Sequence, residues 1–183
     1  MSNLTAGHIV LSDTKTGFIP NAIKWFTRSN FSHSFVIMPN ILSIPMCIEA
    51  AESGVDFTRF DTGYVSNNNE GYQIWSIKID QKIKEAALVS LLNELEISYG
   101  FFQYLWFIWR RICLLFGKDI KSQNNWINEG MICSQLCVYY LKALGLSNVL
   151  AGYGNGSIAP QDLQNIFIAH PDIFELIEVV RLP

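Results

Sequence analysis

The sequence is poor in charge and in the residues that usually build metal or disulfide sites. Only 16% of its 183 residues are charged, and the formal net charge is -3. This balance excludes the overall basic excess typical of nucleic-acid-binding proteins, so we expect no nucleic-acid partner. The three histidines and four cysteines show no zinc-finger spacing, and four cysteines are too few for a disulfide framework. We therefore expect free thiols, no metal site and no cofactor.

Long hydrophobic runs and a leader are also missing. Residues 1–13 contain neither a basic region nor an extended apolar run, so we expect no signal peptide and a cytoplasmic location. The most apolar stretch, residues 101–116, has 13 apolar residues in 16 but is interrupted by Gln103, Arg110 and Arg111. It is shorter than a membrane-spanning helix, and we expect a buried or interfacial helix.

Half of the residues are hydrophobic, which is enough to bury a sizeable core. We expect one α+β domain over residues 1–183, with a helical, aromatic-rich insertion at about 98–129. Alternation and β-branched runs predict strands at 8–12, 33–38, 45–51, 55–60, 72–79 and 173–182. Periodicity, caps and proline positions predict helices at 20–27, 81–97, 101–116, 131–144 and from 160 onward. Among the boundary signals, Asp80 caps the helix 81–97, Gly145 ends the helix 131–144, and Pro39-Asn40 ends the second strand.

Cys133 is the strongest candidate for a nucleophile. It lies in the first turn of the expected helix 131–144, where unpaired backbone N–H groups and the helix dipole favour a thiolate. The same N–H groups could bind the oxyanion of a tetrahedral intermediate. The other cysteines, Cys47, Cys113 and Cys137, are expected to be small buried hydrophobic residues, and Cys133 has the same alternative interpretation.

His33 is the candidate base, although a histidine between two serines at a strand end is often an ordinary surface residue. If the second and third strands form a hairpin centred on Ile41, His33 lies directly opposite Glu49, with about 4.5–5.5 Å between their Cβ atoms. A carboxylate in that position would hold one imidazole tautomer and stabilise the charged form. A slip of one residue would instead place Glu49 opposite Ser34, and Glu49 would then be an outward-facing residue.

Three segments occur in an order typical of a known family. They are a strand containing Ser32-His33-Ser34, a second strand containing Ile48-Glu49-Ala50, and a late helix opening with Met131-Ile132-Cys133-Ser134. Together they resemble the permuted papain-like hydrolases of the NlpC superfamily, in particular the YiiX-like branch. Residues 7–11, 22–27 and 157–163 are similar to further segments of that branch, so the resemblance spans about residues 6–168.

The resemblance implies a circularly permuted papain-like α+β fold. An antiparallel sheet carrying His33 and Glu49 would pack against a helix carrying Cys133. It also implies roles for these residues: Cys133 as nucleophile, His33 as base and Glu49 as the orienting group, with the Cys133 N–H in the oxyanion hole. Members of the family cleave amide bonds, often in peptidoglycan stem peptides; some relatives act on lipid acyl groups, and some phages carry similar proteins.

Three features depart from the family pattern. His8 stands where the opening motif usually has aspartate, and the insertion at 98–129 has no counterpart that we can place. The missing export signal means that a wall-cleaving enzyme would need delivery by a phage particle, a secretion system or lysis. Otherwise its substrate would be cytoplasmic.

The leading hypothesis is a cysteine peptidase or amidase that hydrolyses a peptide substrate through an acyl-enzyme. The second is a lipid-directed acyl hydrolase or acyltransferase that uses the same triad. It depends on residues 101–116, whose tryptophans and basic residues suit peripheral membrane contact, although the helix could simply pack on the sheet. The third is a catalytically silent binding module. The sequence leaves the scissile bond and the oligomeric state open.

Overall fold

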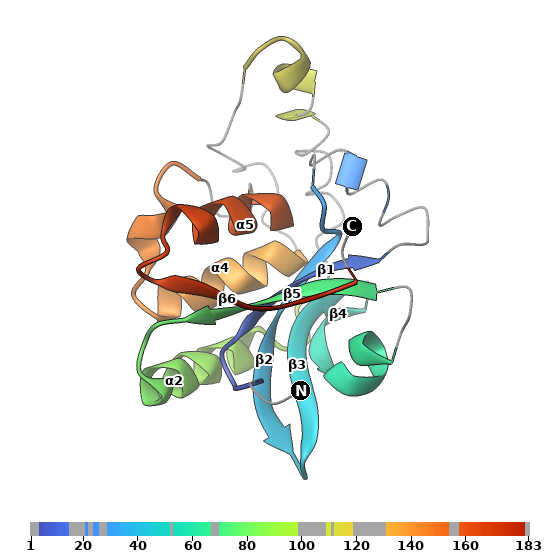
Figure 1. Ribbon diagram of the computed structural model, residues 1–183, viewed down its shortest axis with the longest axis vertical. Helices are drawn as coiled ribbons and strands as arrows, with labels where there is room; N and C mark the ends of the chain where they lie inside the picture. The colour runs from blue at the N-terminus through green and yellow to red at the C-terminus, as the bar shows by residue number, and fades with distance from the viewer. Residues whose placement is uncertain are drawn as a thin grey trace.

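The computed structural model describes residues 4–14, 21, 24–25, 29–51, 53–66, 70–98, 109–110, 112–118, 131–153 and 158–181. A six-stranded antiparallel sheet of order β4-β3-β2-β1-β5-β6 forms the centre of this part (Figure 1). Its strands are β1 (Ile9–Thr14), β2 (His33–Ile41), β3 (Ile44–Ala51), β4 (Gly54–Arg59), β5 (Glu70–Ile77) and β6 (Phe174–Val180). The expected α+β class and the expected antiparallel sheet are confirmed.

Among the described helices are α2 (Gln81–Leu91), α4 (Cys133–Ala143) and α5 (Pro160–Ala169), with short 3-10 helices at Leu92–Glu94 and Ser147–Leu150. These three α-helices lie on one side of the sheet, whereas a five-residue π-helix, Asp61–Val65, lies on the other (Figure 1). The π-helix was not predicted. Most of the expected helix 20–27 and most of the expected insertion 98–129 lie outside the described residues, although the described residues 21, 24 and 25 are helical.

Strand alternation divides the core between the two faces of the sheet. Val36 and Ile48, which are paired across β2 and β3, belong to the cluster that contains Leu136 of α4. Their neighbours along the strands face the other way, so that Phe35 packs with Tyr64 of the π-helix. Burial of each such side chain stabilises the folded state by roughly 1.5–3 kcal/mol. The α-helices are therefore held on one face of the sheet and the π-helix on the other.

The hairpin between β2 and β3 differs from its predicted register. The strand continues through Pro39, and the turn contains only Leu42 and Ser43, with φ angles of 50° and 67°. A bulge between Met38 and Ile41 then sets the pairing of Val36 with Ile48. The predicted direct opposition of His33 and Glu49 is therefore wrong by two residues. Because side chains alternate with a period of two, this shift leaves both on the same face.

Helix boundaries follow the predicted caps where the signal is local. The Asp80 carboxylate accepts a hydrogen bond from the Lys82 N–H at 2.9 Å, and Gly145 follows α4 with φ of 78°. However, α2 ends at Leu91, not at residue 97 as predicted. Residues 96 and 97 instead pair with Val55, whose N–H donates to the Ile97 carbonyl at 3.0 Å. This tertiary pairing thus overrides the helical periodicity of hydrophobic residues that predicted a helix up to residue 97.

Candidate active site

Cys133 is the first residue of α4, preceded by the extended residue Ile132. Its side chain is buried, with a relative exposure of 4%. Ser34, the second residue of β2, lies beside the Cys133 sulfur. The first turn of α4 thus lies against the start of β2, where His33 opens the strand.

His33 lies between two groups that come from opposite sides of the sheet. Its Nε2 atom is 2.5 Å from Oε2 of Glu49, which is on the π-helix side. The thiol of Cys133, which comes from the helical side, lies close enough to the imidazole for their charges to interact. The side chains of His33 and Glu49 are only 17% and 8% exposed, so this line of three groups is largely shielded from solvent. The structure thus brings together the three residues singled out in the sequence.

Tyr64 is a fourth member of this cluster that the sequence analysis missed. Its hydroxyl donates a hydrogen bond to the same Oε2 atom of Glu49 at 2.5 Å. Its ring is nearly parallel to the His33 ring, with centroids 6.5 Å apart and an interplanar angle of 9°. One π-helical turn leaves no hydrophobic period to detect, and π-turns are frequent at functional sites. The one available hint was the spacing of four between Phe60 and Tyr64.

The environment of Cys133 opposes the usual effect of burial on a thiol. Burial alone raises the pKa of Cys133, but the positive charge and hydrogen bond of His33, together with Ser34, lower it below its ordinary value of 9.0. Cys137, one turn further along α4, is also buried, and burial raises its pKa to about 12. Burial likewise raises the pKa of Cys47. Among these three thiols, only Cys133 has a cation beside it and favours the thiolate.

His33 and Glu49 complete the charge pattern. Burial would lower the pKa of His33, but the thiolate of Cys133 and the carboxylate of Glu49 together raise it to about 10. Burial would raise the pKa of Glu49, but the hydrogen bonds and charge of His33 and its contacts with Thr58 and Tyr64 lower it to about 2. Near neutral pH the site therefore favours an imidazolium between two anions.

The other candidate residues lie apart from this cluster. His8 precedes β1, is buried, and contacts Thr5, whose Oγ1 lies 2.8 Å from the His8 Nε2. Burial, with help from Lys84, lowers the pKa of His8 to about 4, so His8 is neutral near pH 7. His8, which stands where the family motif usually has aspartate, is therefore a neutral, buried residue. His170 lies at the C-cap position of α5.

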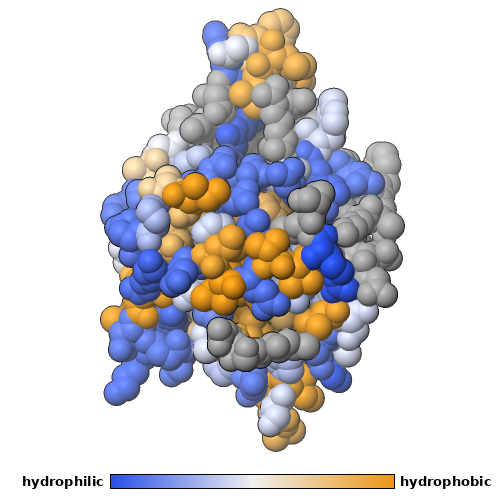
Figure 2. Space-filling model, viewed as in Figure 1, coloured by the Kyte–Doolittle hydropathy of each residue, from blue (hydrophilic) through white to orange (hydrophobic). Residues whose placement is uncertain are grey.

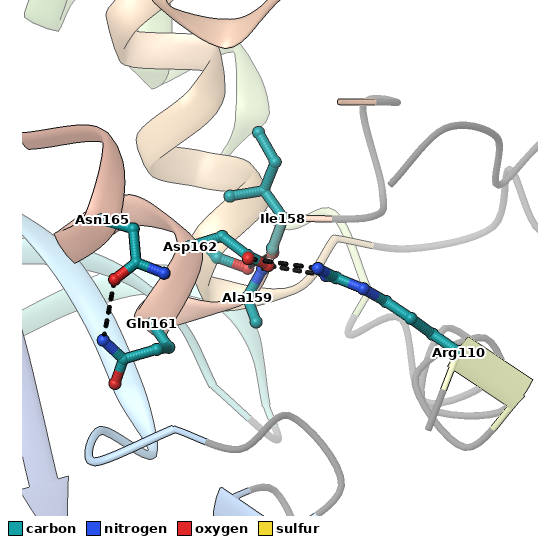
Figure 3. A network of polar contacts seen from close by, with 7 residues as sticks. Arg110, Ile158, Ala159, Gln161, Asp162 and Asn165 are labelled. Atoms are coloured by element: carbon teal, nitrogen blue, oxygen red, sulfur yellow. Dashed lines mark hydrogen bonds and ion pairs between the residues drawn. The ribbon is translucent and has the colours of Figure 1, made fainter. Parts of the chain in front are cut away.

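A second polar network supports the helix that carries Cys133. The hydroxyl of Ser134 donates to the Ile158 carbonyl at 2.5 Å, which ties α4 to the segment before α5. At the start of α5, Asp162 accepts the Ala159 N–H at 3.0 Å. Asp162 also accepts two bonds from Arg110, at 2.7 and 3.3 Å (Figure 3). Arg110 therefore joins the 109–118 segment to the framework around Cys133.

Comparison with known proteins yields a structural relative. No protein-family model matches the chain, and no curated protein matches it in sequence. One similar solved structure is the crystal structure of the metalloprotein YiiX from Escherichia coli. The TM-score is 0.52 at 15% identity, and the alignment covers 97% of this chain and 98% of that one. The protein therefore has a YiiX-like fold.

The description of that relative as a metalloprotein raises the question of whether the present site fits a metal ion. In the described part of the chain, no three histidine, cysteine, aspartate or glutamate side chains are grouped so that they could hold one. In the cluster at His33, the imidazole is hydrogen-bonded to the carboxylate and interacts electrostatically with the thiol. These residues therefore do not fit a metal centre.

Proposed function

We propose that this protein is a cysteine hydrolase of the permuted papain-like type seen in the NlpC superfamily, with Cys133, His33 and Glu49 as its triad. The observation that carries the proposal is the continuous line of thiol, imidazole and carboxylate at the start of α4 and β2. A nucleophile at a helix start, a base bonded to it and a group that orients the base form the general pattern of nucleophilic catalysis.

In the proposed reaction, the Cys133 sulfur attacks the carbonyl carbon of an amide, and its proton resides on His33. The backbone N–H at Cys133 is unpaired within α4 and is available to the oxyanion of the tetrahedral intermediate. As this intermediate collapses, the imidazolium donates its proton to the departing amine, and a thioester remains on Cys133. His33 then takes a proton from water, which attacks the thioester and releases the acid and the free enzyme.

Glu49 and Tyr64 have positioning roles in this scheme. Because the Glu49 carboxylate holds Nε2, the other ring nitrogen of His33 is left to exchange a proton with the thiol. The hydroxyl of Tyr64 holds the carboxylate in place and favours its ionised form. The imidazole of His33 is thus held in one orientation, in which it can accept the proton of Cys133, and does not need to change rotamer before the attack.

The preferred substrate class is an amide in a peptide, with peptidoglycan stem peptides as the first candidates. An acyl ester of a lipid is the second candidate, because the same thiolate forms the same thioester with it. The observation that favours this second class is an exposed apolar surface on the 109–118 segment. The products distinguish the two: an amine leaves in the first case and an alcohol in the second.

The test is direct detection of the acyl-enzyme. Wild type and Cys133→Ala are incubated with muropeptides and with short-chain acyl esters, and intact-protein mass spectrometry records any acyl adduct. We expect an adduct on wild type alone, mapped to Cys133, together with turnover that His33→Ala reduces by about 100-fold or more. Turnover that survives in Cys133→Ala would refute the proposal. Binding without adduct or turnover would favour the silent binding module.

A further inference from the structure

The 109–118 segment exposes an unusual group of large hydrophobic side chains. Trp109, Ile112, Leu115 and Phe116, here called the apolar tip, are 48%, 41%, 68% and 81% exposed. The segment projects from the end of the molecule beyond α5, far from the β2–β3 hairpin (Figure 1). The same projection appears as a hydrophobic cap at the top of Figure 2. Contiguous exposed hydrophobic side chains mark an interaction site more often than single ones do.

The orientation of the side chains in this segment is the reverse of that expected for a surface facing water. The guanidinium of Arg110 points inward to Asp162, and these side chains are only 11% and 10% exposed. The neighbouring aromatic and aliphatic side chains point outward. The two hydrogen bonds of Arg110 to Asp162 attach the segment to the start of α5 (Figure 3). Such an arrangement favours an apolar environment around the tip.

The charge of the segment indicates which environment this is. Residues 101–118 contain Arg110, Arg111 and Lys118 but no acidic residue, which gives a formal charge of +3. Because Asp162 neutralises Arg110, the positive charge left in the segment is that of Arg111 and Lys118. The whole chain has a net charge of -3, so the other 165 residues carry -6. Positive charge is thus concentrated in the segment that also has the greatest apolar exposure, and the exposed Lys118 lies two residues beyond Phe116.

We propose that the apolar tip docks on an anionic lipid surface. Its tryptophan, phenylalanine and aliphatic side chains would enter the boundary between headgroups and acyl chains, with the exposed Lys118 at the level of the headgroups. The contact is peripheral: none of the helices in the described ranges is both long and apolar enough to cross a bilayer. A projecting tip suits a soft lipid surface, which closes around it, whereas a protein partner would need a preformed cavity of matching shape.

The test is cosedimentation of the full chain with large vesicles of phosphatidylcholine, alone or with 30% phosphatidylserine. The tip variant is the double substitution Leu115→Asp and Phe116→Asp. Its control is Leu42→Asp, which introduces one aspartate, against two in the tip variant, at a 91% exposed leucine in the β2–β3 turn. Lys118→Glu tests the electrostatic contribution, and Cys133→Ala tests independence from the proposed chemistry.

We expect wild type, Leu42→Asp and Cys133→Ala to bind the anionic vesicles equally, with binding that weakens as salt increases. The tip variant should bind at least tenfold more weakly, and Lys118→Glu should lose several-fold of the preference for anionic vesicles. Equal binding by the tip variant and the Leu42→Asp control would overturn the proposal, as would absence of binding by wild type. A wild-type dimer in solution that the tip variant abolishes would assign the surface to a second copy of the chain. Since Cys133→Ala is included, failure of the proposed hydrolase would not alter these outcomes.

Discussion

Replacement of His33 by alanine should abolish the reactivity of Cys133 at neutral pH. In the structure, burial raises the pKa of this thiol, and the charge and hydrogen bond of His33 are the main influences that lower it below 9.0. A thiol with a pKa of 9.0 is about 1% ionised at pH 7. Without His33 the effect of burial dominates, so the thiolate fraction of Cys133 at pH 7 should fall below about 1%.

The assay is alkylation by iodoacetamide from pH 5 to 10, with each cysteine quantified by peptide mass spectrometry. For wild type we expect Cys133 to react fastest and to keep its reactivity below pH 7. In His33→Ala, its rate at pH 7 should be about a hundredth or less of its rate at pH 10, because only the thiolate reacts. The ratio within one variant is used because it cancels differences in access to the buried sulfur.

Two internal controls make the result specific. His170→Ala removes a histidine at the end of α5 and should leave the Cys133 profile unchanged. Cys137 shares the helix, but burial raises its pKa to about 12, so it should label slowly at every pH tested. A Cys133 profile that is the same in wild type and in His33→Ala would refute the assignment of His33 as its partner.

Further predictions concern stability, measured by urea unfolding. Because the folded-state pKa of Glu49 is about 2 against an ordinary 4.5, its carboxylate should contribute about 3 kcal/mol above pH 4.5. This contribution should be lost as the pH falls through about 2, and Glu49→Gln should lack that pH dependence. Tyr64→Phe removes a hydrogen bond to a charged group and should cost about 2 kcal/mol at pH 7, while Cys133 labelling changes by only a few-fold. Asp162→Ala should cost about 3 kcal/mol, since it leaves Arg110 unpaired in a largely buried position. Gly7→Ala should cost at least about 2 kcal/mol, because φ is 88° and the new Cβ would lie 2.4 Å from a tyrosine hydroxyl.

The π-helix explains why the carboxylate of this site is anchored so firmly. Glu49 lies on the face of the sheet away from α4, where a charged side chain enters an otherwise apolar cluster. A buried carboxylate requires partners, and His33 and Tyr64 supply them from two directions. The apolar cluster around Phe35 and Phe60 holds the Tyr64 ring and thereby fixes the position of its hydroxyl.

Capping and proline signals determined three helix ends correctly, whereas the local Pro39-Asn40 signal did not end β2. A proline starts α5, the Asp80 side chain caps α2, and a glycine with positive φ follows α4, because each depends on the backbone within one turn. Composition and alternation determined the α+β class and the existence of the sheet strands. The position of Cys133 at a helix start could also be predicted. Hairpin pairing suggested His33 and Glu49 as its partners, and the resemblance to a family implied the same residues.

Only the tertiary structure decided how these pieces meet. The register of β2 and β3 depends on a two-residue turn and a bulge, which hydrophobic alternation does not encode. The end of α2 depends on the pairing of residues 96 and 97 with Val55. The position of Tyr64 depends on a π-helical turn that packs into the hydrophobic cluster on the side of the sheet away from α4. Above all, Cys133 and His33 are 100 residues apart in the chain. Local propensity extends over a few residues, whereas contact across such a distance requires the packed core to close the intervening loops.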